Sequence, residues 1–214
     1  MTRSIPELTQ KILNGYRIKR GSDLEIFKTG DLEELEKGAG AIQKRYRHNH
    51  VDLCSIINGR SGRCPEDCKY CAQAACHKTD IKEYAFLPKE ELYAAAKKNQ
   101  EAGLNRFAVV TAGRALTGAE FDQAIAAFEM MQKDLSIGLC ASMGFLSAKQ
   151  FRRLKAAGVT SYHHNIETSR RFFPYICTTH TYDDKIREIR LAQKEGLRVC
   201  SGGIIGMGET WEDR

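Results

Sequence analysis

Long apolar runs and basic blocks are both missing from this sequence of 214 residues. No stretch reaches the roughly 18 consecutive apolar residues that cross a bilayer, so we expect no membrane-spanning segment. The N-terminal residues MTRSIPELTQKILNG lack the apolar centre of a secretory signal. Lys and Arg are interleaved with Asp and Glu rather than with aromatic residues, so the net charge of +6 indicates solvated faces and not a nucleic-acid surface. We therefore expect a cytoplasmic protein with no membrane and no nucleic acid among its partners.

Cysteine is abundant where the rest of the composition is ordinary. The chain is 42% hydrophobic and 28% charged, which is typical of a soluble globular protein with one sizeable core. It nevertheless contains eight cysteines. The cytoplasm keeps thiols reduced, so a disulfide framework is not expected there. Metal binding or catalysis is the better explanation for so many cysteines.

Hydrophobic periodicity divides the chain near residue 50. The preceding part shows helical spacing, with helices expected at 7–13, 24–29 and 32–47. The following part alternates between strands and helices. The expected strands are 51–58, 105–111, 135–142, 159–166 and 197–205. The expected helices are 88–102, 117–133, 147–157, 183–195 and a last one starting at residue 209.

This alternation predicts an α/β fold with a parallel sheet. A closed TIM-type (β/α) barrel of eight units takes roughly 250 residues. The sequence offers only about five or six βα units, so we expect an incomplete barrel. The predicted domains are an N-terminal helical extension, 1–50, and a barrel domain, 51–214, truncated before the last strands.

A loop rich in cysteine follows the first predicted strand. Cys64, Cys68 and Cys71 have the spacing C-x3-C-x2-C, which differs from that of bacterial ferredoxins. Three thiolates on a cubane cluster leave the fourth iron open to a ligand from outside the protein. The loop also follows a strand at the end where barrel enzymes place their active sites. The alternative is a structural zinc site with Cys76 or His77 as fourth ligand.

Four sequence blocks resemble the biotin synthase family of the radical S-adenosylmethionine (radical SAM) superfamily. They are SGRCPEDCKYCAQ (61–73), YHHNIETS (162–169), TTHTYDD (178–184) and VCSGGIIGMGET (199–210). The resemblance runs from about residue 50 to the end, and it implies a radical SAM barrel with C-terminal truncation. It also implies a [4Fe–4S] cluster on Cys64, Cys68 and Cys71, with S-adenosylmethionine as cofactor.

The resemblance also assigns ligand-binding residues. The implied contacts of S-adenosylmethionine are Tyr70, Thr111, Glu167 and Gly206. Asn165 is expected to contact the ureido ring of dethiobiotin, with His163 beside it. His163, Asn165 and Glu167 alternate at the end of a predicted strand, so we expect them on one face. The alternative for His163 is a polar strand end that binds no ligand. The alternative for Gly206 is a tight turn between a strand and a helix.

A second cluster, [2Fe–2S] in the family, is the implied sulfur donor, and its ligand set is altered here. Cys140 and Cys200 match two of the three expected cysteines, but Ala108 occupies the position of the third. The arginine expected late in the barrel lies beyond residue 214. We predict that Cys54, on the neighbouring strand, replaces the missing cysteine; the alternative is an ordinary thiol. Cys76 and Cys177 are weaker candidates because both lie in predicted loops.

The activity implied by the resemblance is radical-mediated insertion of sulfur into dethiobiotin, which gives biotin. A flavodoxin- or ferredoxin-type donor would supply electrons, and the full-length enzyme would be a homodimer. The alternatives are a hydrogenase maturase or methylornithine synthase type of enzyme, neither of which needs Cys140 and Cys200, and a non-catalytic iron–sulfur fragment. His180 also replaces an arginine that some members place near the nucleoside. We expect the 214 residues alone to lack turnover because the barrel is open.

Overall fold

The chain divides into two compact units, residues 1–52 and residues 53–214. The structure, a computed structural model, describes residues 4–19, 21–22 and 24–214. Over these residues no helix is both long enough and apolar enough to cross a membrane.

The first unit packs two longer helices against each other. Helix α1 (Ile5–Leu13) begins at Ser4, whose hydroxyl accepts a hydrogen bond from the Glu7 N–H, and α3 (Leu32–Arg47) is capped in the same way by Asp31. A short helix, α2 (Ile26–Thr29), lies between them. Gly38 of α3 allows the close approach, since a Cβ there would lie 2.4 Å from the Thr9 hydroxyl oxygen.

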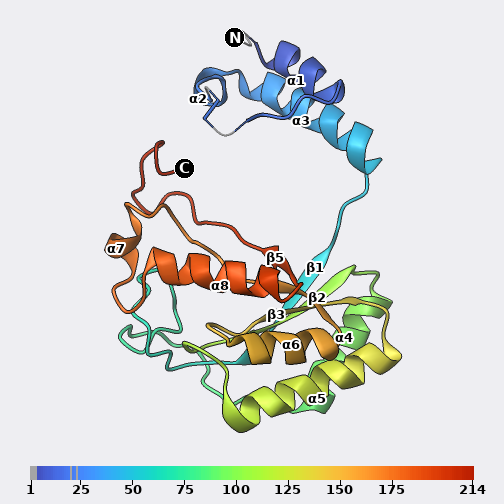
Figure 1. Ribbon diagram of the computed structural model, residues 1–214, viewed down its shortest axis with the longest axis vertical. Helices are drawn as coiled ribbons and strands as arrows, with labels where there is room; N and C mark the ends of the chain where they lie inside the picture. Colours follow the sequence, from blue (N-terminus) through green and yellow to red (C-terminus); the bar gives the residue numbers. More distant parts are fainter. Residues whose placement is uncertain (1–3, 20, 23) are drawn as a thin grey trace. The chain divides into compact units, whose positions relative to one another are not determined.

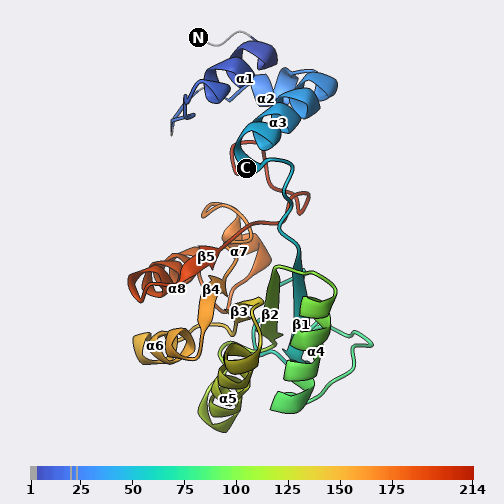
Figure 2. The same cartoon turned by 90° about the vertical axis from the view of Figure 1, so that its right-hand side faces the viewer.

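The second unit, described throughout residues 53–214, contains one curved sheet of five parallel strands in the order β1-β2-β3-β4-β5. The strands are β1 (Cys54–Arg60), β2 (Arg106–Thr111), β3 (Gly138–Ser142), β4 (Val159–His163) and β5 (Arg198–Cys200). The connecting helices are α4 (Lys89–Glu101), α5 (Gly118–Asp134), α6 (Ala148–Ala156), α7 (Phe173–Ile176) and α8 (Tyr182–Lys194). Figures 1 and 2 show α4, α5, α6 and α8 along the outer face of the curved sheet. The predicted α/β class and incomplete barrel are therefore correct.

Alternation along the strands separates the two faces of this sheet. Phe107 and Val109 of β2, with Leu139 and Ala141 of β3, belong to the buried cluster that packs against the helices. Because successive side chains in a strand point to opposite faces, the residues between them point to the inner face of the barrel. Cys140 is one of these inner residues.

Several predicted boundaries are wrong, mostly at strand ends. Strand β1 begins at Cys54 rather than residue 51, β4 ends at His163 rather than 166, and β5 spans only 198–200. The short helix α7 has no counterpart in the predictions. The helix expected from residue 209 is replaced by a turn, in which the Glu209 carboxylate accepts hydrogen bonds from the N–H groups of Gly206 and Met207. Glu209 therefore stabilises the preceding loop instead of beginning a helix.

Candidate metal and cofactor site

The cysteine-rich loop leaves the carboxyl end of β1 and folds back on itself. The N–H of Cys64 donates to the carbonyl of Gln73 at 2.9 Å, and the N–H of Ala75 donates to the carbonyl of Cys64 at 2.8 Å. Inside this closed segment the N–H of Cys71 donates to the carbonyl of Cys68 at 3.0 Å. The backbone thus holds the three predicted cluster cysteines in one tight loop at the end of the sheet where barrel enzymes place their active sites.

The three predicted cluster thiols are at least partly shielded from solvent. Cys68 is buried, and Cys64 and Cys71 are partly buried. Burial raises the pKa of Cys64, and burial together with the nearby Cys177 raises the pKa of Cys68 to about 12. Without a cation, the Cys68 thiol is therefore protonated. A bound metal centre would take the place of the proton, because thiolates are the ligand form of cysteine.

The two residues considered as a fourth zinc ligand are differently placed. The Nε2 atom of His77 lies 3.2 Å from the backbone carbonyl oxygen of Cys68, which occupies this ring nitrogen, and the Cys76 side chain is exposed beside His77.

Two acidic residues between the cysteines bind the segment that follows α7. The Asp67 carboxylate accepts hydrogen bonds from the N–H and hydroxyl of Thr178 and from the N–H of Thr179, and these bonds hold its pKa well below the usual range. The Glu66 carboxylate lies 2.5 Å from His180 Nδ1 and 2.9 Å from an Arg114 nitrogen. Arg114 and Glu66 thus form an ion pair.

The segment after β4 forms one wall of a pocket. Glu167 has a left-handed backbone with φ of 66° and forms a parallel bridge to Gly203. Its carbonyl accepts from the N–H of Ile204 at 2.8 Å, and its side chain helps to line a cavity of about 410 Å³. The Tyr70 hydroxyl is near this carboxylate, and burial of the hydroxyl followed by the Glu167 charge raises the Tyr70 pKa.

The side chains of His163, Asn165 and Glu167 lie near one another, since the Glu167 carboxylate hydrogen-bonds to the Asn165 side chain and feels the charge of His163. Only His163 belongs to β4, where it pairs with Cys200 of β5. Beyond β4, the Asn165 Oδ1 atom accepts a hydrogen bond from the Gly202 N–H at 3.0 Å. One end of the Asn165 amide is therefore occupied by the protein backbone.

Thr111 and Gly206 also lie at loop-facing ends of the second unit. The Thr111 hydroxyl oxygen, at the end of β2, is buried without a hydrogen-bond partner among the described residues. A buried hydroxyl oxygen without a hydrogen-bond partner is a suitable contact for a ligand atom. Gly206 has φ of 98°, which favours glycine, and its N–H already donates to Glu209.

Cys54, Cys140 and Cys200 share the inner face of the sheet. Ile57 of β1 and Val199 of β5 pack against the helix-side core, so Cys54 and Cys200, an odd number of residues away from them, point inward as Cys140 does. Burial first, and then the neighbouring thiols of Cys54 and Cys200, raise the pKa of Cys140 to about 12. Ala108 is paired with Cys140 in the strand register, on the same face.

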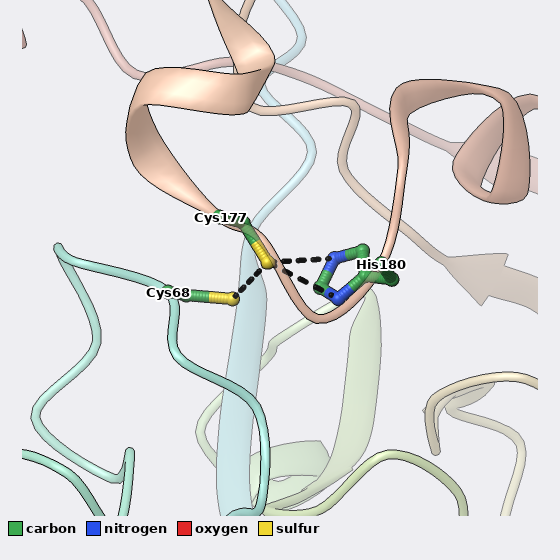
Figure 3. A group of neighbouring side chains, drawn as sticks. All are labelled: Cys68, Cys177 and His180. Atoms are coloured by element: carbon green, nitrogen blue, oxygen red, sulfur yellow. Dashed lines mark hydrogen bonds between the residues drawn. The ribbon is translucent and has the colours of Figure 1, made fainter.

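A further group of side chains that could hold a metal ion escaped the sequence analysis. Cys68, Cys177 and His180 are all buried, and their sulfur and nitrogen atoms lie within 4.8 Å of one another (Figure 3). Cys177 was considered only as a weaker candidate for the second cluster, and His180 only as a replacement for arginine. The C-x2-H spacing of Cys177 and His180 was the available signal.

Comparison with known proteins identifies the superfamily to which this chain belongs. The protein-family model of the radical SAM superfamily matches residues 60–214, so the chain belongs to that superfamily. Membership implies a [4Fe–4S] cluster and S-adenosylmethionine. Within the superfamily the chain is a homologue of biotin synthases. It is 58% identical to the biotin synthase of Clostridium beijerinckii over 97% of this chain and 66% of that protein.

Two further relatives give the same result. The identity is 52% to the biotin synthase of Alkaliphilus metalliredigens, over 98% of this chain and 66% of that protein. It is 46% to that of Clostridium tetani, over 100% of this chain and 67% of that protein. The chain therefore spans about two thirds of the length of these relatives.

Solved structures support the fold. Methylornithine synthase superimposes with a TM-score of 0.80 at 18% identity, over 96% of this chain and 61% of that one. The hydrogenase maturase HydG superimposes with a TM-score of 0.74 at 20% identity, over 96% of this chain and 47% of that one. At such identities the likeness concerns the fold alone.

Proposed function

We propose that this chain belongs to an enzyme that inserts sulfur into dethiobiotin and so forms biotin. The observation that carries the proposal is the closed loop of Cys64, Cys68 and Cys71 at the carboxyl end of β1, in a chain 58% identical to a biotin synthase. When bound, the cluster and S-adenosylmethionine supply a radical that removes hydrogen from unactivated C–H bonds, which no side-chain acid or base could do.

The residues of the chain bind and orient the participants. Cys64, Cys68 and Cys71 hold the [4Fe–4S] cluster as thiolates. Tyr70 and Glu167 lie side by side next to the cavity that Glu167 lines, and a carboxylate there suits the ribose hydroxyls of the nucleoside. The contacts with S-adenosylmethionine are assigned to Tyr70, Thr111, Glu167 and Gly206, in keeping with the orphaned Thr111 hydroxyl.

Dethiobiotin is assigned to the inner face of the sheet, near His163 and Asn165. Two further polar atoms suit a urea-bearing ligand there. Asn58 Oδ1 and Ser161 Oγ are buried without hydrogen-bond partners among the described residues. Their strands place both on the face that carries Cys140, since Asn58 and Ile57 point to opposite faces and Ser161 pairs with Cys140.

The second cluster is assigned to Cys54, Cys140 and Cys200. All three lie on one face, and the charges of the outer two act on Cys140. Cys54 thereby takes the role that Ala108 cannot fill. Methylornithine synthase and hydrogenase maturases do not need such a trio, so it favours sulfur insertion over those activities. The electron donor is proposed to be of flavodoxin or ferredoxin type, the enzyme a homodimer, and its compartment the cytoplasm.

Spectroscopy of the anaerobically reconstituted protein tests the primary cluster. We expect the reduced protein to show an EPR signal that S-adenosylmethionine perturbs, and we expect Cys64→Ala, Cys68→Ala and Cys71→Ala each to abolish it. Cys76→Ala is the matched control in the same loop and should keep the signal. Survival of the perturbed signal in Cys64→Ala would remove the basis of the proposal.

Mössbauer spectroscopy counts the clusters by type. Cys140→Ala and Cys54→Ala should each remove the second cluster and leave the [4Fe–4S] spectrum intact. An unchanged second cluster in Cys54→Ala would assign that cysteine to an ordinary thiol.

A further inference from the structure

Cys177 and His180 belong to neither of the two proposed cluster sites, yet Cys177 contacts the cluster cysteine Cys68, and His180 contacts Cys177. Figure 3 shows the three side chains, with Cys68 coming from the loop after β1 and Cys177 following α7 directly. The Sγ atom of Cys68 lies 3.7 Å from that of Cys177. Cys177 Sγ lies 3.8 Å from His180 Nε2 and 3.3 Å from Nδ1.

These separations match two ligands of one tetrahedral ion. Thiolates bonded at about 2.3 Å to a tetrahedral zinc lie about 3.8 Å apart, and a thiolate and an imidazole nitrogen about 3.5 Å apart. Two cysteines of an iron–sulfur cluster each bind a different iron, so their sulfur atoms must lie farther apart. The observed 3.7 Å between Cys68 and Cys177 therefore fits a mononuclear centre.

The contact of His180 with Glu66 leaves the other ring nitrogen, Nε2, available as a metal ligand. Its Nδ1 atom lies 2.5 Å from a Glu66 carboxylate oxygen. With Nδ1 donating to this carboxylate, the lone pair of the His180 ring lies on Nε2. A ring held in this way presents the Nε2 lone pair, as metal-ligating histidines do.

We propose that Cys68, Cys177 and His180 form a mononuclear, tetrahedral metal site for zinc, with solvent as the fourth ligand. Soft thiolates and an imidazole favour zinc, and binding of Zn²⁺ releases the two thiol protons, so the charge balances. Asp67, which lies 3.2 Å from Cys177 Sγ and binds the Thr178 N–H, helps to hold Cys177 in place.

Cys68 belongs to this site and also, if the proposed function is right, to the [4Fe–4S] cluster. The two metal centres therefore exclude each other. Zinc at the mononuclear site occupies one cluster ligand and blocks cluster assembly until the zinc leaves. Cys177 and His180 are dispensable for the cluster itself, since its ligands are Cys64, Cys68 and Cys71.

Cobalt(II), a spectroscopic substitute for zinc, tests the site in the metal-free protein kept without oxygen. We expect one cobalt per chain, with the visible bands of a tetrahedral ion and charge-transfer absorption from two thiolates. Cys177→Ser and His180→Gln should weaken cobalt binding by more than the roughly 10–100-fold that loss of an outer-shell partner costs. Cys64→Ala, matched in loop and chemistry, should bind cobalt as the unaltered protein does.

X-ray absorption of the zinc-loaded, unaltered protein gives a readout that needs no variant. Two sulfur ligands and one imidazole at about 2.3 and 2.0 Å are expected. Three sulfur ligands without imidazole would place the zinc on the cluster cysteines and overturn the proposal. So would unchanged cobalt binding in Cys177→Ser together with its loss in Cys64→Ala.

Cluster reconstitution separates this proposal from the function proposed above. Cys177→Ser should take up the [4Fe–4S] cluster even with zinc present, whereas zinc should block uptake in the unaltered protein. Equal inhibition by zinc in both proteins would refute the shared-ligand site. Retention of the cluster by Cys64→Ala would instead refute the cluster assignment.

Discussion

Glu188 offers a quantitative test of the packing behind the site. It lies in α8 with only 5% of the residue exposed, and its carboxylate accepts a hydrogen bond of 2.6 Å from the Leu146 N–H. Burial raises its pKa from 4.5 to about 7, although the Leu146 N–H and Lys185 act in the opposite direction. The substitution Glu188→Gln keeps an oxygen acceptor for Leu146 and removes the charge.

The sign of the change in unfolding free energy with pH follows from proton linkage. Between about pH 4.5 and pH 7 the folded protein keeps on Glu188 a proton that the unfolded chain has lost, so the free energy of unfolding falls as pH rises through this window. A pKa raised from 4.5 to about 7 corresponds to about 3 kcal/mol in all, most of it developed between pH 5 and 8. Glutamine does not ionise and avoids this loss.

Urea denaturation followed by circular dichroism measures the effect. The unfolding free energy of Glu188→Gln should rise relative to that of the unaltered protein by about 2–3 kcal/mol between pH 5 and 8. The control is Glu91→Gln on α4, an exposed glutamate whose substitution should leave the pH dependence of the unaltered protein unchanged. Parallel pH profiles for Glu188→Gln and the unaltered protein would show that Glu188 is ionised in the folded state.

Two substitutions test the pocket wall and the sheet. In Gly203→Ala the new Cβ would lie 2.8 Å from the Glu167 carbonyl oxygen, so we expect a loss of about 1–3 kcal/mol in unfolding free energy and weaker binding of S-adenosylmethionine by calorimetry. Gly202→Ala is the control, because its Cβ would meet nothing nearer than 3.8 Å, and equal effects of the two would refute the steric argument. Tyr162 is fully buried and its hydroxyl accepts from the Met143 N–H at 3.2 Å, so Tyr162→Phe should cost about 1–3 kcal/mol in urea denaturation. A cost below about 0.5 kcal/mol would show that the hydroxyl contributes no more than a typical surface group.

Local pattern explains what could be predicted from the sequence. The parallel sheet was predicted because strands and helices differ in the period of their apolar residues, and that period is visible in any short window. The cluster loop was found for the same reason, since Cys64, Cys68 and Cys71 lie within eight consecutive residues. Strand ends were predicted less well. Asn165 was predicted to belong to this strand, but β4 ends at His163, and the Asn165 side chain accepts a hydrogen bond from Gly202, 37 residues away.

Only tertiary structure decided which distant side chains meet. Cys177 is separated from Cys68 by 109 positions, and no period or spacing connects them. They meet because the threonines after Cys177 bind the Asp67 carboxylate, which fixes that segment on the cysteine loop. The sequence by itself determined the fold class and predicted one set of metal ligands. The folded chain brings a second candidate set together, because packing and hydrogen bonds between separate loops fix the directions of side chains that local sequence leaves open.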